Sequence, residues 1–163
     1  TAFKQAVLKG LDALHREVEL AYVDRIGLRY LDAVLPSPAY PLEALLNPGL
    51  IGLYREVAGA PQHTVTETVS HVVGGTLVIR TLLSAQGVAL PPDLQPMSLQ
   101  LDARIAASQG GEAAVLDSDY FVTQRQSFDS QAVERQLDAS HDVIIEAFRM
   151  ATTDQARREL WQL

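Results

Sequence analysis

Residues 64–83 read TVTETVSHVVGGTLVIRTLL, two runs rich in β-branched residues on either side of a Gly-Gly pair. β-Branched residues favour strands, and adjacent glycines favour the tight turn of a β-hairpin because they adopt positive φ without strain. The stretch therefore predicts strands over 64–73 and 76–83. With Gly74 and Gly75 as the loop, the predicted cross-strand pairs are Val69 with Arg80 and His71 with Val78.

Two further parts of the chain have the period-two pattern of strands. Residues 22–34 alternate an apolar set with a set that carries Arg25 and Arg29, and we expect the apolar set to face the helices. Residues 99–105 alternate apolar and polar side chains, and a Gly-Gly pair then leads into the apolar residues 113–122. These patterns predict one long strand and a second hairpin.

Helical periodicity occurs at both ends of the chain. Residues 3–18 carry apolar side chains every three or four positions, which is typical of an amphipathic helix. Phe128 and Asp129 are typical of a hydrophobic staple and an N-cap, and residues 152–155 fit a capping box for a last short helix. The expected fold is a single α+β domain over residues 1–163, with an antiparallel sheet of about five strands and helices packed on one face.

Composition excludes several classes of protein. The chain has 163 residues, a formal net charge of −7 and no cysteine. The acidic balance makes nucleic acid an unlikely partner and argues against a polybasic membrane anchor. A chain without cysteine has no thiol catalysis, disulfides or thiolate zinc sites. No apolar run reaches the ~20 residues that cross a bilayer, and the first residues do not resemble a secretory signal. We therefore expect no membrane contact and a cytoplasmic location.

The predicted sheet face that carries arginines is the strongest candidate for a binding site. Arg25 and Arg29 share a face because they are four apart on a strand, and Arg80, Arg104 and His71 are the further candidates on neighbouring strands. Arginines on one face can bind a phosphate or carboxylate through two-pronged contacts. The alternative is a solvated or domain-packing face on which the arginines pair with Asp and Glu, and this alternative is favoured.

No pattern in the sequence identifies catalytic chemistry. The chain has no nucleophile elbow, P-loop or zinc-protease motif, and its four histidines have no ligand spacing that predicts a metal site. Asp117 and Asp119 alternate on one strand face and resemble a carboxylate pair, although a hairpin edge has the same pattern. We therefore predict no catalytic residue, no metal and no cofactor.

Three motifs resemble those of a known family. They are Arg25-Ile-Gly-Leu-Arg-Tyr-Leu-Asp32, Leu116-Asp-Ser-Asp-Tyr-Phe121, and a closing helix with Leu137, His141, Phe148 and then Trp161. Together they resemble the C-terminal half of an uncharacterised, sporadically distributed bacterial family with an Arg-x-Gly-x-Arg-Tyr-Ile-Asn strand. The chain departs from that pattern at Asp32, where the family usually has Asn, and at Ala33. The resemblance implies a fold and a further N-terminal domain but no activity.

These observations favour a non-catalytic binding or assembly module. The chain begins within a predicted helix, so we expect it to be the C-terminal part of a longer protein. Its expected partner is another protein, the preceding domain or a second copy of itself. The alternative is a small enzyme, or a domain that binds a small anion or a nucleotide on the arginine face.

Overall fold

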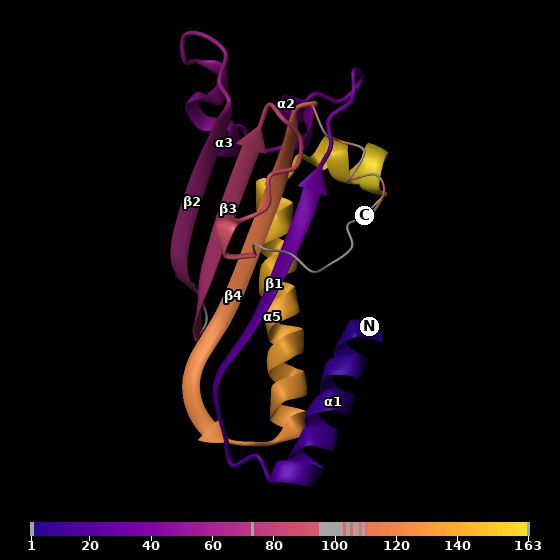
Figure 1. The fold of residues 1–163 in the computed structure, drawn as a ribbon, viewed down its shortest axis with the longest axis vertical. Coiled ribbons are helices and arrows are strands. Elements are labelled where there is room, and N and C mark those ends of the chain that lie inside the picture. Colours follow the sequence, from indigo (N-terminus) through magenta and orange to yellow (C-terminus); the bar gives the residue numbers. More distant parts are fainter. Residues whose placement is uncertain are drawn as a thin grey trace.

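The computed structural model describes residues 2–72, 74–94, 103, 105, 108 and 110–162. The described residues form one four-stranded sheet and several helices (Figure 1). In chain order, the elements are α1 (Ala2–Val18), β1 (Tyr22–Val34), α2 (Leu42–Leu45), α3 (Pro48–Ile51), η1 (Gly52–Arg55), β2 (His63–Val72), β3 (Gly75–Ser84), η2 (Pro92–Leu94), β4 (Ala113–Ser127), α5 (Ser130–Ala151) and η3 (Ala156–Trp161).

The prediction of an α+β fold with an antiparallel sheet is confirmed, but the sheet has four strands in the order β1-β4-β3-β2. The predicted pairing of residues 99–105 with β4 is wrong, because β4 pairs with β1 on one side and with β3 on the other. Most of residues 99–105 lie outside the described part of the chain, and Ala103 and Ile105 are helical. β4 is therefore a central strand with both edges paired, and its first six residues are all buried.

The hairpin of β2 and β3 is confirmed, but its predicted register is wrong by two residues. Arg80 pairs with Glu67, and Val72 pairs with Gly75, so Gly75 is the first residue of β3. A Cβ on Gly75 would lie 2.6 Å from both the backbone oxygen of Phe121 and the hydroxyl of Tyr120. Gly75 therefore permits a close approach to β4 instead of forming the loop. Because side chains alternate with period two, the shift leaves Arg80 on its predicted face.

The helix α5 runs along one face of the sheet (Figure 1). Its Ile144 and Ala147 pack with Leu77 of β3 and Tyr120 of β4 in one cluster of the core. The predicted N-cap of this helix is confirmed, since the Asp129 side chain accepts a hydrogen bond from the backbone N–H of Gln131. At the other end of the sheet, a second core cluster lies under α2 and α3.

The last helix is capped one residue later than predicted. Thr153, not Thr152, accepts a hydrogen bond from the backbone N–H of Ala156 at 3.0 Å. The Thr152 hydroxyl instead donates to the carbonyl oxygen of Phe148 at 2.7 Å. Thr152 is the C-cap of α5, so its backbone already belongs to the preceding helix.

Candidate functional site

Two of the predicted site arginines meet at one buried carboxylate in the middle of the sheet. Arg29 donates through Nε and Nη2 to the two carboxylate oxygens of Asp117, each at 2.7 Å. The side chain of Asp117 is fully buried, and Nη1 of Arg80 lies 3.4 Å from its Oδ2. Two-pronged pairing of this kind is among the strongest charge-assisted contacts in proteins. The environment of Asp117 is therefore that of a structural counter-ion between two arginines.

The outer sides of both guanidinium groups are occupied as well. Nη1 of Arg29 lies 2.5 Å from a carboxylate oxygen of Asp93 on η2, and Nε of Arg80 lies 2.5 Å from Glu67. The hydrogen bond from Arg29 lowers the pKa of Asp93, and the bonds to Asp117 and Asp93 raise the pKa of Arg29. Three carboxylates thus surround two guanidinium groups, so this network has no surplus positive charge for an anion.

The other predicted site residues lie outside this network. The side chain of Arg25 is 54% exposed, and its Nη2 lies 3.8 Å from Oδ2 of Asp119. Its guanidinium lies 4.2 Å from the centroid of the Phe121 ring. His71 lies near the end of β2, beside the turn. Arg104 lies outside the described residues. The structure therefore brings Arg29 and Arg80 together but leaves Arg25 and His71 apart from them.

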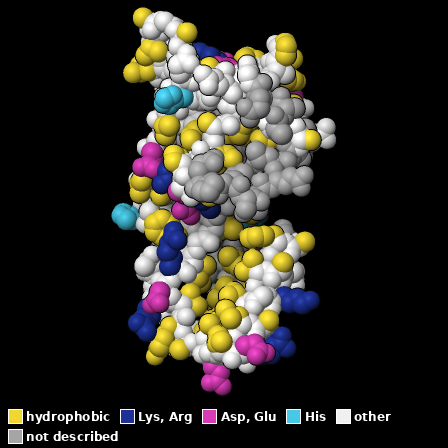
Figure 2. Space-filling view, viewed as in Figure 1, with side chains coloured by type: hydrophobic (Ala, Val, Ile, Leu, Met, Phe, Trp, Pro, Cys, Tyr) yellow, Lys and Arg dark blue, Asp and Glu magenta, His cyan; other side chains and the backbone are white. Residues whose placement is uncertain are grey.

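A groove between α1 and the sheet was not predicted from the sequence. The sequence of α1 is amphipathic, yet none of its residues is buried. Figure 2 shows hydrophobic side chains gathered in the hollow between the sheet and α1. The groove has a volume of about 530 Å³, and its apolar lining includes Val7, Leu11, Leu14, Tyr22, Ile26 and Phe128. Two of these side chains are about half exposed, Leu14 at 48% and Tyr22 at 55%.

Contacts with α5 and with Phe128, which comes just before that helix, hold α1 in this position. Nζ of Lys4 lies 2.8 Å from Asp138 and 3.2 Å from Glu134 of α5, and these hydrogen bonds raise the pKa of Lys4. At the other end of α1, the ring centroids of His15 and Phe128 lie 4.7 Å apart. The helix is therefore anchored beside α5 while its apolar side faces the groove.

The wall of the groove opposite α1 is the outer edge of the sheet. β1 is a terminal strand in the sheet order, and its residues 22–27 line the groove. Among the described strands, only β4 pairs with β1, and the outer edge of a terminal strand presents backbone N–H and C=O groups to which another strand can pair. The groove thus combines an apolar floor with a strand edge that has no partner among the described strands.

A small cavity of about 60 Å³ lies farther along β1, between α1 and α5. The Tyr30 hydroxyl lies 3.1 Å from Nδ1 of His141 there, and both side chains are half-buried. Tyr30 belongs to the apolar set of residues 22–34 that was expected to face the helices, but no pattern in the sequence indicated that His141 would be its partner. The volume admits one or two water molecules rather than a substrate.

Comparisons with family models, with curated proteins and with solved structures found no match to this chain. The resemblance to the bacterial family therefore rests on the sequence motifs alone. Within the described ranges, no helix is long and apolar enough to cross a membrane. The same residues contain no group of three or more His, Asp or Glu side chains that could hold a metal ion.

Proposed function

We propose that this chain is a non-catalytic, cytoplasmic protein-binding module that takes up an extended segment of a partner protein beside β1. The segment would add to the sheet as a further strand and rest on α1. The observation that carries the proposal is that the apolar side of α1 lies beside a strand edge that no described strand pairs with. Strand addition to a sheet edge is a recurrent mode of peptide recognition, in which backbone hydrogen bonds give affinity and side-chain pockets give specificity.

The other edge of the sheet is less suited to this role. On β2, four of the five side chains on the same face as the buried Leu83 and Leu77 are polar: Thr64, Thr66, Thr68 and Ser70, with Val72 at the end of the strand. Of the described helices, the four-residue α3 and η1 lie against β2, so a strand added there would have no long amphipathic helix beside it. A strand added beside β1 would cover the exposed side chains of α1, and burial of apolar surface is the main source of binding free energy.

The geometry favours a single extended segment over a second copy of the chain. Neighbouring strands lie about 5 Å apart, and packed helices lie about 8–10 Å apart. Because α5 packs behind β1 and β4 and α1 packs beside α5, a second copy paired through β1 would bring its α5 into the space of α1. A lone strand needs no helix of its own and avoids this collision.

The groove also indicates the chemistry of the segment. Side chains of an added strand would alternate between the helix side and the open side of the sheet. Those on the helix side would contact Leu11 and Leu14 and should be large and apolar. On the open side lies Arg25, whose side chain is half exposed, so an acidic residue on the added strand would form a favourable cross-strand pair.

Selection from a display library of random 12-residue peptides tests the proposal. We expect the selected peptides to alternate large apolar residues with polar residues that include Asp or Glu. Their binding should protect backbone amides of β1 against hydrogen exchange, while the amides of β2 keep their free-state rates. A random library is suitable because the groove specifies the side-chain chemistry of the bound segment rather than one particular protein.

A matched pair of variants locates the binding. Leu14→Asp places a charge in the groove, whereas Leu53→Asp places the same charge on η1, where Leu53 is 67% exposed and lies outside the groove. Full burial of a leucine contributes about 1.5–3 kcal/mol, and about half of the Leu14 side chain remains to be covered. Leu14→Asp should therefore weaken binding roughly 3- to 10-fold through the lost apolar contact, and burial of the aspartate charge adds to this loss. Leu53→Asp should leave the affinity unchanged. Equal weakening by both variants, protection of β2, or a dimer that Leu14→Asp dissociates would contradict the proposal.

A further inference from the structure

A second pocket lies at the opposite end of β1 from the groove. It has a volume of about 370 Å³, within the usual range for small-ligand sites, and it is lined by the last residues of β1 together with Ile105, Phe148 and Trp161. The ring centroids of Phe148 and Trp161 lie 5.4 Å apart with a tilt of 50°. The wall of this pocket is therefore aliphatic and aromatic.

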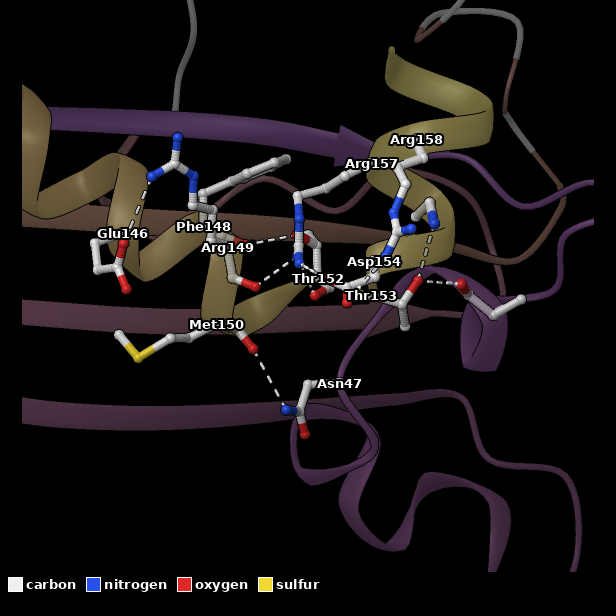
Figure 3. Close-up of polar contacts among 12 residues, drawn as sticks. Asn47, Glu146, Phe148, Arg149, Met150, Thr152, Thr153, Asp154, Arg157 and Arg158 are labelled. Carbon is white, nitrogen blue, oxygen red and sulfur yellow. Dashed lines mark hydrogen bonds and ion pairs between the residues drawn. The ribbon is translucent and has the colours of Figure 1, made fainter. Parts of the chain in front are cut away.

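The aromatic part of the wall is held by a network of hydrogen bonds at the end of α5. Nη1 of Arg157 donates to the carbonyl oxygen of Arg149 at 2.6 Å and to the Thr152 hydroxyl at 2.9 Å. Figure 3 shows the side chain of Arg157 reaching from the last helix to the end of α5, with its other terminal nitrogen paired to Asp154. These contacts fix η3 against α5, and η3 carries Trp161. The pocket is thus built on anchored elements.

Among the described residues that line this pocket, Asp32 is the one with a charged side chain. Among the described residues, no hydrogen bond or ion pair reaches its carboxylate, and burial raises its pKa. Two other carboxylates of the sheet that are fully or largely buried have arginine partners. Asp117 binds Arg29 and Arg80, and Asp119 lies beside Arg25. A half-buried carboxylate without a cation costs free energy, so Asp32 departs from the pattern of the rest of the sheet.

We propose that the pocket formed by Asp32, Phe148 and Trp161 binds an organic cation, an ammonium or guanidinium group attached to an apolar body. The carboxylate would form an ion pair with the cation. The aromatic rings would stabilise it through cation–π contacts, and the aliphatic wall would cover the apolar part of the ligand. This site is independent of the groove and does not rest on the proposed strand addition.

The chain offers a direct optical probe of this site, because Trp161 is its single tryptophan. We would titrate the protein with benzylamine and follow Trp161 fluorescence, with benzyl alcohol as an uncharged control of nearly the same shape. We expect a saturable change with benzylamine and at least a tenfold weaker response to benzyl alcohol. Equal affinity for the two compounds, or no saturable response to benzylamine, would overturn the proposal.

Two isosteric variants separate the local ion pair from the overall charge. Asp32→Asn should reduce the affinity for benzylamine to that for benzyl alcohol, and Asp142→Asn should leave it unchanged. Both variants remove one negative charge from a net charge of −7, and Asp142 is exposed on α5 and does not line the pocket. If both variants weaken benzylamine equally, the amine is attracted only by net charge. As a second measurement, carbon-13 NMR of the Asp32 carboxyl should show a lower pKa when benzylamine is bound, and an unchanged pKa would also contradict the site.

Discussion

Removal of the Arg29 charge should destabilise the fold far more than removal of the neighbouring Arg25 charge. Arg29→Met deletes the guanidinium while keeping most of the apolar stem. It leaves the fully buried Asp117 carboxylate with Arg80 at 3.4 Å as its remaining partner. Removal of one member of a buried ion pair typically costs about 3–5 kcal/mol, because the other charge stays buried without compensation. In a chain of this length, that loss lowers Tm by roughly 6–20 °C.

The control is Arg25→Met, on the same strand and the same face. Arg25 is more exposed and lies 3.8 Å from Asp119, and exposed pairs of this kind contribute about 0–1 kcal/mol. Urea unfolding followed by circular dichroism gives the free energy of unfolding for both variants, provided that the m-values agree. The double variant Arg29→Met with Asp117→Leu should recover most of the loss, since it leaves no unpaired buried carboxylate. A loss below about 1 kcal/mol for Arg29→Met, equal to that of its control, would refute the description of Asp117 as a buried counter-ion.

Two further predictions concern Gly75 and Asp32. Gly75→Ala should destabilise the fold by about 1–3 kcal/mol in the same urea assay, because the added Cβ would meet β4 at 2.6 Å. The control Gly10→Ala should be neutral or slightly stabilising, because Gly10 has open space around it. Similar losses of stability for both variants would contradict the close approach of Gly75 to β4. Asp32→Asn should increase stability at pH 7, because burial raises the folded-state pKa of Asp32 above 3.8 and its ionisation therefore disfavours the folded state. This gain should disappear as the pH falls below about 4, where Asp32 is protonated in both the folded and the unfolded state. A loss of stability at pH 7 would contradict this reasoning, because it would mean that a cationic side chain of the same chain pairs with Asp32.

Local patterns in the sequence predicted the elements that depend on neighbouring residues. The β-branched runs around residues 64–83 predicted the hairpin, and the helical spacing of residues 3–18 predicted α1. The cap of α5 followed from Asp129 in the same way. These features are encoded within a few residues, so the rest of the chain has little influence on them.

Contacts between distant segments explain the predictions that were wrong. The hairpin register depends on the approach of Gly75 to β4, more than 40 residues later in the chain. The pattern of residues 113–122 indicated a strand but not that both of its sides would already be paired. Period two is a property of one strand, whereas strand order is set by the packing of the whole sheet.

The candidate sites show the same difference between local patterns and contacts of distant segments. Alternation placed Arg29 and Arg80 on one face, and the structure brings them together. It did not reveal that Asp117 would be buried between them, or that η2 would bring Asp93 to Arg29. The groove was missed because an amphipathic helix predicts an apolar face but not whether another element covers that face.

The groove and the Asp32 pocket share a physical property that the arginine network lacks. In the network, each buried charge has a partner, so its residues already contribute to the stability of the isolated chain. Along α1 the apolar side chains remain partly or fully exposed, and at Asp32 a half-buried carboxylate lacks a described partner. Both arrangements cost stability, and such departures from favourable packing are typical of functional sites. A ligand that binds only the folded state offsets this cost by mass action. The predicted stabilisation by Asp32→Asn and the predicted loss of benzylamine binding are therefore two consequences of the same unpaired charge.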